Sequence, residues 1–314
     1  MFNNLLSALK RLDRLLEQAV AAAQAVYGSE APTDAYQGLY LTQNDVEQLL
    51  ARTPGTPSFS VNGEVIEAFL ADVASDVPPL TWLQQIFDLS TFDLAVVLIA
   101  LAPEVDLRYE RLYSYLQDDI TRKRPTVDLA LNLLCPSAEI RLWRQAHFVP
   151  DAPLMRQNLL HLVADPHQVQ PPQLAHYLKL DEQIVHWLLG QEGLDSRLTK
   201  VCQYVKATVV LEALPLSQDV QQALRSLTLH ARDAHQPLQL YFHGSRGVSK
   251  RRTAEAIAHS LGMYLLVGDL ERLVNAKTDI EQILKLLFRE AQLKQAVLYL
   301  DGLDCLRSTE QTST

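Results

Sequence analysis

Apolar side chains recur at alternating spacings of three and four over the first 26 residues, the heptad pattern of a helix that packs along one seam. Gly28 follows the pattern and ends the predicted helix, so residues 1–28 form the first predicted element. The seam fits either a helix packed on its own domain or a helix that binds a partner or a second copy. Its positions are Phe2, Leu5, Leu9, Leu12, Leu16, Ala19, Ala23 and Val26.

Residues 29–79 lack this periodicity and are rich in proline, glycine, threonine and serine. One short helix is predicted from Thr42 to Arg52, because Thr42 can cap its first turn and Asp45 adds a carboxylate near its positive end. The rest of the segment predicts loop. We therefore expect residues 29–79 to form a loop-rich linker that contains a short helix.

From residue 80 the apolar spacing is helical again, and a predicted hairpin follows the helices. Residues 159–163 have the composition of a strand, and Phe148 is predicted to begin the partner strand. Helices followed by a hairpin predict a winged-helix-like domain over residues 80–200, with a helical linker over residues 201–236. The predicted helices are one around Leu83 and Phe87, one capped by Ser90 and closed by Pro103, one over residues 107–116, one after Pro125, and two short helices within residues 172–190.

In residues 237–314 the pattern of apolar residues predicts alternating strands and helices, and this alternation indicates βαβ units with parallel pairing. The fold class is therefore mixed: a mainly helical N-terminal region with a winged-helix-like domain, then an incomplete α/β domain. The predicted elements are a buried strand over 238–243, a glycine-containing loop, a helix over 250–261, a strand over 264–267, a helix over 280–293 and a strand over 296–300 that ends in Asp301.

Composition narrows the function classes. The net charge of −9 over 314 residues makes nucleic acid an unlikely partner, because duplex binding depends on basic surface. The basic run 122–124 fits either a solvated loop or a set of phosphate contacts.

The longest apolar run, 94–102, is too short to cross a membrane. The three cysteines and nine histidines show no metal-ligand spacing, so we expect buried free thiols and a cytoplasmic protein that does not bind membranes.

The segment 241–251, Tyr-Phe-His-Gly-Ser-Arg-Gly-Val-Ser-Lys-Arg, is close to a phosphate-binding loop, whose usual form is G-x-x-x-x-G-K-[ST] between a strand and a helix. Such a loop points backbone N–H groups and a helix N-terminus at one anion, and its lysine adds a point charge. Ser249 replaces the last glycine, and Arg251 replaces the hydroxyl that binds magnesium. Arg251 would substitute its own charge for that of the metal, which favours nucleotide binding without effective hydrolysis. The candidate nucleotide-binding residues are Gly244, Ser245, Gly247, Ser249, Lys250 and Arg251.

A second motif follows some fifty residues later, where the apolar run 296–300 ends in Asp301. An acidic residue at the end of such a strand is typical of a magnesium-positioning carboxylate. Gly302 occupies the next position, where a glutamate normally activates water. The competing interpretation of both motifs is a strand–turn–helix unit in which the glycines only form a tight corner.

Together with the stretch 100–131, which begins Ala-Leu-Ala-Pro-Glu-Val-Asp-Leu-Arg-Tyr, these motifs resemble the N-terminal part of tandem AAA+ ATPases that carry a variant winged-helix domain. Such proteins are often encoded with contractile injection systems. The resemblance covers nearly the whole chain, which would end inside a first, degenerate AAA module. It implies ATP and Mg²⁺ as cofactors, with Lys250 on the β- and γ-phosphates and Asp301 facing Mg²⁺. It also implies protein partners and a ring-forming homo-oligomer in the full-length form.

Two functions follow as hypotheses. The first is an ATP-binding protein of the AAA family, whose full-length relatives remodel or assemble proteins and in which this module has little or no hydrolytic activity. The chain would lack the fourth and fifth strands, the arginine finger and the helical lid of a complete module. The second is a non-enzymatic adaptor that binds partners through its N-terminal helix and winged-helix region.

Overall fold

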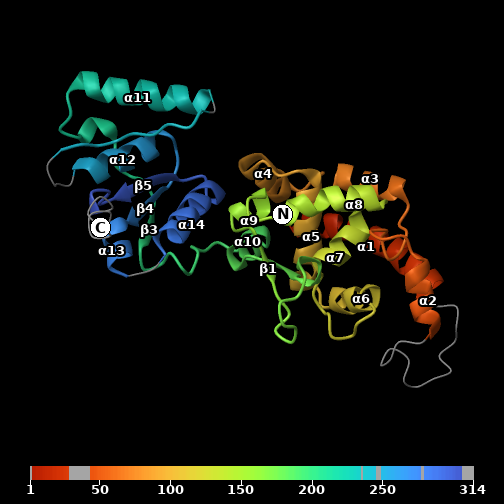
Figure 1. Ribbon diagram of the computed structural model, residues 1–314. Helices are drawn as coiled ribbons and strands as arrows, with labels where there is room; N and C mark the ends of the chain where they lie inside the picture. Colours follow the sequence, from red (N-terminus) through yellow and green to blue (C-terminus); the bar gives the residue numbers. More distant parts are fainter. Residues whose placement is uncertain (1, 28–42, 235, 245–248, 277–278, 306–314) are drawn as a thin grey trace. The chain divides into compact units, whose positions relative to one another are not determined.

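The computed structural model describes residues 2–27, 43–234, 236–244, 249–276 and 279–305 (Figure 1). It divides into two compact units, Met1–Glu192 and Gly193–Thr314. The first unit is mainly helical and contains a two-stranded sheet, whereas the second contains a three-stranded sheet with helices.

The first unit is built around α5 (Thr91–Val105), which is apolar on all sides and buried from residue 92 to residue 103. A helix of this kind is stable only when other elements cover it completely. As predicted, Ser90 caps it: the Ser90 hydroxyl accepts the Asp93 backbone N–H, and the Asp93 carboxylate accepts the Ser90 N–H. The helices that pack against α5 are α1 (Phe2–Tyr27), α3 (Gly63–Asp72), α4 (Pro78–Phe87), α6 (Arg108–Leu116) and α7 (Val127–Leu134).

The predicted N-terminal helix is confirmed as α1, and its seam is buried inside its own unit. The seam positions from Leu5 to Ala23 are 0–6% exposed, and α1 packs against α3, α5, α6 and α7. Tyr109 and Arg108 of α6 both donate to Asp13 of α1, which fixes the two helices side by side. The structure therefore uses the seam for packing within the unit.

The loop-rich linker predicted over residues 29–79 is wrong in part. The short predicted helix is present as α2 (Gln43–Ala51), while Thr42 and the Asp45 side chain lie outside the described part of the chain. A second helix, α3, was not predicted. Asn62 caps α3, and Ile66 and Phe69 on its inner face are buried. The ten-residue stretch GEVIEAFLAD does contain apolar residues at helical spacing, but the proline, glycine and serine around it favoured the interpretation as loop.

The prediction that Pro103 closes α5 is also wrong, because the helix continues to Val105. A proline lacks the backbone N–H that would bond to the carbonyl four residues earlier, here Ile99. The Tyr113 hydroxyl donates to that carbonyl oxygen at 2.9 Å, so the unpaired acceptor is satisfied by α6. The compensating group lies in another helix, where local sequence rules cannot detect it.

A helix–turn–helix pair followed by a hairpin completes the first unit. The turn at residues 135–137 joins α7 to α8 (Ala138–Arg144), and β1 (Leu160–Val163) follows as predicted. The partner of β1 is β2 (Tyr177–Leu180), antiparallel, with Leu160 opposite Leu180. The assignment of Phe148 as the start of that partner is wrong, since Phe148 is buried in η1 (Gln145–Phe148). The remaining elements are α9 (Pro153–Arg156), η2 (Gln173–Ala175) and α10 (Glu182–Leu188), so one of the two helices predicted within 172–190 is a 3₁₀ turn that leads into a strand.

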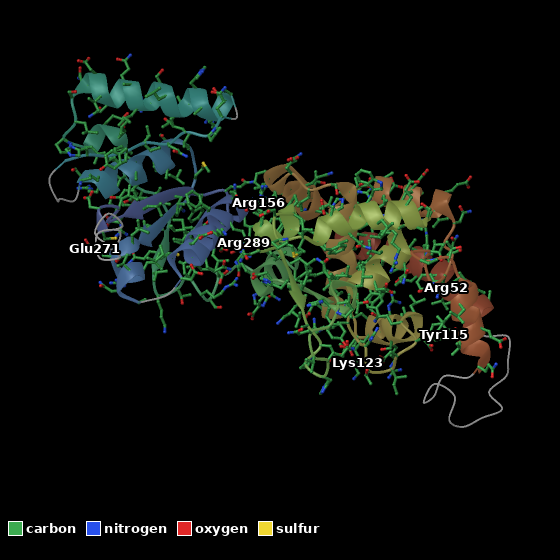
Figure 2. All side chains as sticks on the ribbon, viewed as in Figure 1. Arg52, Tyr115, Lys123, Arg156, Glu271 and Arg289 are labelled. Carbon is green, nitrogen blue, oxygen red and sulfur yellow. The ribbon has the colours of Figure 1, made fainter. Side chains whose placement is uncertain are left out.

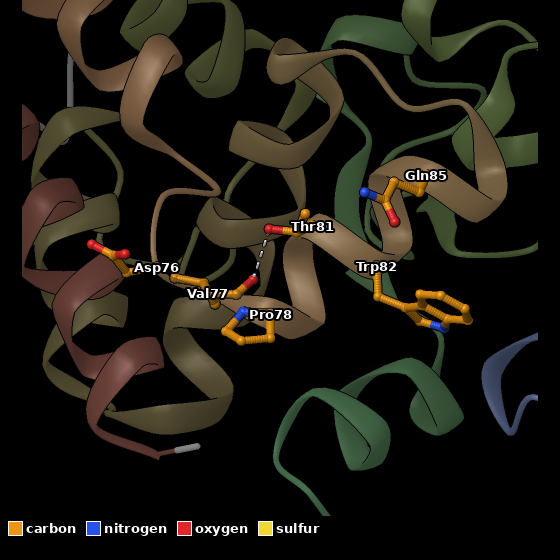
Figure 3. A pocket seen from close by; sticks show the side chains of 6 residues that line it. All are labelled: Asp76, Val77, Pro78, Thr81, Trp82 and Gln85. Carbon is orange, nitrogen blue, oxygen red and sulfur yellow. Dashed lines mark hydrogen bonds between the residues drawn. The ribbon is translucent and has the colours of Figure 1, made fainter.

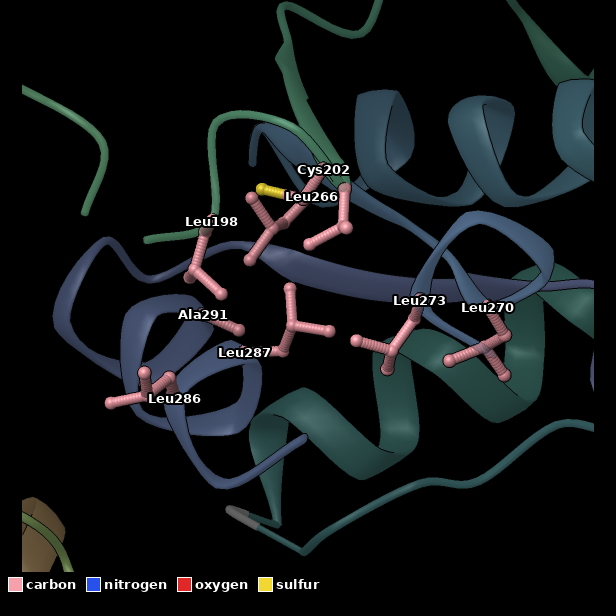
Figure 4. Packing of buried hydrophobic residues seen from close by; sticks show 9 residues of the cluster. Leu198, Cys202, Leu266, Leu270, Leu273, Leu286, Leu287 and Ala291 are labelled. Carbon is pink, nitrogen blue, oxygen red and sulfur yellow. The ribbon is translucent and has the colours of Figure 1, made fainter. Parts of the chain in front are cut away.

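The second unit is a three-layer α/β arrangement around the sheet β3-β4-β5. β4 (Leu265–Asp269) and β5 (Val297–Asp301) are parallel, as the alternating pattern predicts, whereas β3 (Cys202–Val205) runs antiparallel to β4. One face of the sheet packs on α12 (Ser249–Ser260) through Ala254 and Ala258. The other face packs on α13 (Leu270–Asn275) and α14 (Ile280–Leu293), whose leucines form the cluster in Figure 4.

The buried strand predicted over residues 238–243 is wrong: this segment is not a strand, and most of its side chains are exposed. Phe242 alone packs against the α12 face of the sheet. A strand requires a neighbour that accepts its backbone hydrogen bonds, and none of the described strands pairs with this segment. The sheet instead gains β3, which lies in the stretch 201–236 that we predicted as a helical linker; that stretch also contains η3 (Leu211–Ala213) and α11 (Gln218–Asp233).

Within the described residues, no helix combines the length and apolar character needed to cross a membrane.

Candidate functional site

The described residues of the predicted phosphate loop lie at the start of α12. The helix begins at Ser249, and the Lys250 ammonium donates to the Gly244 carbonyl oxygen at 2.9 Å. Gly244 has a φ of +149°, a backbone conformation that favours glycine. Ser245 and Gly247 lie outside the described residues. The lysine is therefore placed at a positive helix terminus, with its charge held by the carbonyl that opens the loop.

Arg251 and Arg252 add two more cations in the first turn of α12, and the described part of this turn contains no acidic residue. Arg251 donates to the Gln203 side-chain carbonyl on β3 at 2.8 Å. Thr253 cannot replace the missing hydroxyl at position 251, because it is buried and its hydroxyl donates back to the Ser249 carbonyl. This end of the helix is thus cationic and accessible to solvent.

Asp301 lies at the exposed end of β5, as its position after the apolar run predicts. Its carboxylate accepts the Tyr299 hydroxyl at 3.3 Å. Burial, and next the Asp301 charge, raise the pKa of Tyr299 to about 12, while Arg251 acts in the opposite direction. Arg251 and Asp301 therefore both lie within electrostatic range of the same phenol. The packing of α12 on β5 brings the two predicted motifs together.

Gly302 follows with a φ of +75°, which strains any residue that has a Cβ atom. An added Cβ would lie 2.9 Å from the Glu271 Cγ of α13. The position therefore has neither the backbone conformation nor the space for the glutamate that would activate water.

The residues at this end of the sheet do not fit a magnesium ion. Mg²⁺ requires several oxygen ligands, and an arginine occupies the hydroxyl position. Asp269, the neighbour of Asp301 in register, caps α13 through the Arg272 N–H and pairs with the Arg272 side chain. Among the described residues no group of three or more His, Cys, Asp or Glu side chains could hold a metal ion.

A buried ionic cluster in the same unit was missed in the sequence. Asp195 accepts Arg289 of α14 at 2.9 Å and Arg197 at 2.6 Å, and Arg289 is 1% exposed (Figure 2 labels Arg289). Glu290 is fully buried beside the cluster, and burial raises the pKa of its carboxyl. The partners are 94 residues apart in the chain, so no local pattern reveals them. The cluster fastens the stretch before β3 to α14.

In the first unit, the basic run at residues 122–124 has its own acidic partners. Arg122 pairs with Asp119 at 3.2 Å, and Arg124 pairs with Glu104 at 3.0 Å. Lys123, labelled in Figure 2, stands between them on the loop before α7. Two of the three charges are therefore neutralised locally, which favours the interpretation of this run as a charged loop over a phosphate-binding patch.

The buried Asp93 forms a polar chain with the half-buried His147 and with Arg144 at the end of α8. The Asp93 carboxylate lies 2.8 Å from His147 Nδ1, and Arg144 donates to His147 Nε2 at 3.2 Å. Because arginine can only donate, His147 Nε2 accepts and Nδ1 carries the proton. Burial alone would raise the pKa of Asp93, but hydrogen bonds from His147 and Ser90 hold it below its usual 3.8. Ser90 bonds to Asp93 and not to the imidazole, so this is no catalytic Ser–His–Asp arrangement.

The outer face of α8 is apolar. Leu142 and Trp143 are 62% and 76% exposed, whereas Arg141 is buried and paired with Asp128. Arg144 turns inward over the Phe92 ring, 4.7 Å from its centroid. The helix thus places its cations inside and its large apolar side chains outside. This face could not be recognised in the sequence, because the alternation of residue types in so short a helix does not show which side is covered.

A shallow depression of about 290 Å³ lies at the start of α4 (Figure 3). The Thr81 hydroxyl in it donates to the carbonyls of Ala74 and Val77, and the Asp76 side chain is exposed. No pair of titratable groups faces it, so it offers no catalytic chemistry. Its lining residues are Asp76, Val77, Pro78, Thr81, Trp82 and Gln85.

Two of the three cysteines are buried free thiols, as predicted, and Cys305 is half-buried. Burial raises the pKa of Cys135 to about 11 and that of Cys202 to about 12, so both are poor nucleophiles.

Comparison with curated proteins and with solved structures gives no match. The family model for "Winged helix domain, variant" matches residues 5–202, a range that begins in α1 and ends at the first residue of β3. This range is wider than the predicted 80–200 and includes α1, α2 and α3. The helix–turn–helix pair α7–α8 and the hairpin β1–β2 lie within it. Because the match covers more than half of the chain, the protein belongs to the variant winged helix domain family.

Proposed function

We propose that the second unit is a degenerate nucleotide-binding module of the AAA type, which belongs to a protein that remodels or assembles other proteins with ATP. The observation that carries this proposal is the meeting of two motifs: the cationic start of α12 and the Asp301 end of β5 belong to elements that pack together. Parallel pairing of β4 and β5 and the covering of both sheet faces by helices support it.

The open edge of the sheet also supports a larger parent fold. The apolar run of β5 has the composition of a central parallel strand, yet its four apolar residues are only half-buried. Among the described strands, β5 pairs with β4 alone. The unpaired segment 238–243 is also apolar at alternate positions. Both segments would be accommodated in a wider sheet of the AAA type, where a further strand lies between them.

The module proposed here binds the phosphates of ATP with protein cations in place of Mg²⁺. Lys250 would contact the terminal phosphates, and Arg251 would supply the charge that the metal supplies elsewhere. Hydrolysis is not expected, because Gly302 provides no base and Arg251 provides no metal ligand.

The test is binding of ATP to the intact chain, measured by calorimetry with Mg²⁺ and with a chelator. We expect saturable binding that does not require Mg²⁺ and is abolished in Lys250→Ala. The matched control is Lys285→Ala on α14, which packs on the other face of the sheet and pairs with Glu281. An absence of binding at millimolar ATP, or equal losses in the two variants, would contradict the proposal.

A second candidate function is a protein-interaction adaptor that works through the winged-helix unit. The observation that favours it is the outer face of α8, where two large apolar side chains are exposed and both arginines are turned inward. Burial of the α1 seam leaves α8 as the stronger candidate for such a role. A chain that binds no ATP but retains protein binding would favour this function over the first.

A further inference from the structure

Arg251, in the first turn of α12, is bonded to a neutral group although carboxylates lie near it. Its guanidinium donates to the side-chain carbonyl of Gln203 on β3 at 2.8 Å. Glu255 lies four residues further along α12, at the usual spacing of a helical ion pair, but its carboxylate accepts two hydrogen bonds from the chain just after β3. Asp269 at the end of β4 pairs with the Arg272 side chain. Neither of these two carboxylates therefore cancels the charge of Arg251.

The strand register places Gln203 and the end of β5 on the same face of the sheet, with β4 between them. Val267 of β4 lies opposite Gln203 on one side and opposite Tyr299 on the other. Directly opposed residues point to the same face, and both Val267 and Tyr299 pack on the α12 side. Asp301 follows Tyr299 by two positions, so it belongs to this face as well. Arg251 thus lies over a surface that has an amide at the β3 edge and a carboxylate at the β5 edge.

Asp301 is the carboxylate that competes with Gln203 for Arg251. It is exposed, and both it and Arg251 lie within electrostatic range of Tyr299. Neighbouring strands are about 4.8 Å apart, so a guanidinium held at β3 is displaced by about 10 Å from the β5 backbone. An ion pair with Asp301 would cancel the charge of Arg251, whereas the amide of Gln203 orients the guanidinium and leaves its charge intact.

We infer that Gln203 is a positioning residue of the nucleotide site: its side-chain carbonyl holds the Arg251 guanidinium at the β3 edge, away from Asp301, where its charge remains available to the phosphates of ATP. The inference rests on the proposed nucleotide binding and adds to it a residue that neither nucleotide motif contains. A guanidinium has five N–H donors, so the bond to Gln203 leaves others for a phosphate.

The test is binding of ATP to the intact chain, measured by calorimetry in the presence of a chelator so that no metal ion shields Asp301. Gln203→Met keeps a side chain of similar length without its carbonyl and allows Arg251 to pair with Asp301. Binding should weaken about threefold to tenfold, the range expected for loss of one hydrogen bond. The same substitution combined with Asp301→Asn should have little effect relative to Asp301→Asn alone, because the competing carboxylate is gone. Gln203→Glu should weaken binding in both backgrounds, since its own carboxylate neutralises Arg251.

The matched control is Gln292→Met, which replaces an exposed glutamine of α14, on the other face of the sheet, and should bind ATP as wild type does. Circular dichroism checks that each variant is folded. Equal affinities of Gln203→Met and wild type, or an equal loss in the two Asp301 backgrounds, would overturn the role of Gln203 and leave ATP binding through Lys250 standing. Undiminished binding by Gln203→Glu would overturn it in the same way. An absence of ATP binding by wild type would overturn both this role and the proposed function.

Discussion

Two helices of this protein, α8 in the first unit and α12 in the second, each contain two arginines, and they are built in opposite ways. α8 turns Arg141 and Arg144 inward and exposes Leu142 and Trp143. α12 buries alanines against the sheet and leaves its cationic first turn accessible. Arg141 of α8 is buried and Arg144 is half-buried, whereas Arg252 of α12 is exposed.

The contrast shows that the number of cations in a motif does not determine the ligand. On α8 the arginines contribute to packing, because Asp128, Phe92 and His147 lie beneath them. On α12 the inner positions are taken by small residues that allow close approach to the sheet, so long cationic side chains must point away from it. Ligand chemistry follows from which side of the helix is covered.

The largest effect is expected from removal of the buried carboxylate that anchors the stretch after α8. Asp93→Ala removes the carboxylate that accepts the Ser90 N–H and bonds to His147, while the Ser90 cap itself remains. Loss of the bond from the Ser90 N–H costs about 1 kcal/mol and loss of the charge-assisted bond to His147 about 2 kcal/mol, so the free energy of unfolding should fall by about 3 kcal/mol. Denaturant unfolding followed by tryptophan fluorescence measures this, since Trp82, Trp143 and Trp187 all lie in the first unit.

Lowering the pH tests the contribution of the Asp93 carboxylate to stability without a mutation. Because the pKa of Asp93 is lower in the folded protein than its usual value, its contribution is present above pH about 3.8 and is lost as the pH falls through the folded value. Wild type should therefore lose stability in acid more steeply than Asp93→Ala. The exposed Asp151→Ala is the control and should change stability by less than about 0.5 kcal/mol. Parallel acid profiles for wild type and Asp93→Ala would contradict the assignment.

Features that depend on neighbouring residues in sequence were predictable. The α1 seam, the Ser90 cap, α14 and the Asp301 strand end all follow from local spacing or from one residue type at a boundary.

Features that depend on distant partners were not predictable. Residues 238–243 have a strand pattern but no described strand pairs with them, while β3 joins the sheet from a stretch that we interpreted as linker. The continuation of α5 through Pro103 depends on a tyrosine of another helix. The orientation of Arg141 on α8 likewise depends on Asp128 of α7. In each case a group remote in the sequence decides the local outcome.

An intermediate effect is expected at the end of β5, where Gly302→Glu would restore the residue type that activates water. The positive φ of Gly302 and the approach of the new Cβ to Glu271 should cost about 2 kcal/mol. No phosphate release from ATP is expected, because Arg251 still occupies the magnesium-ligand position. A phosphate-release assay measures this, with Gly193→Ala as the control because a Cβ there meets open space. Phosphate release by Gly302→Glu would contradict this, because it would show that the glycine alone prevents ATP hydrolysis.

The smallest and most direct comparison replaces one arginine in each helix by methionine, which approximates the aliphatic part of the side chain and removes the charged guanidinium group. Arg141→Met leaves Asp128 with Asn132 alone, and because Asp128 is 40% exposed we expect a loss of only about 1.5 kcal/mol in the first unit. Arg251→Met loses a hydrogen bond to Gln203 at the surface and should change the second unit by less than about 0.5 kcal/mol. Unfolding followed by tryptophan fluorescence measures the stability of the first variant, and hydrogen exchange of the β4 amides measures that of the second.

ATP binding should show the reverse order of effects: Arg251→Met should bind ATP more weakly, and Arg141→Met should bind it as wild type does. Equal effects on stability would mean that α8 and α12 do not differ in how they use their cations, whereas the crossed pattern would separate an arginine that supports the fold from one that faces a ligand.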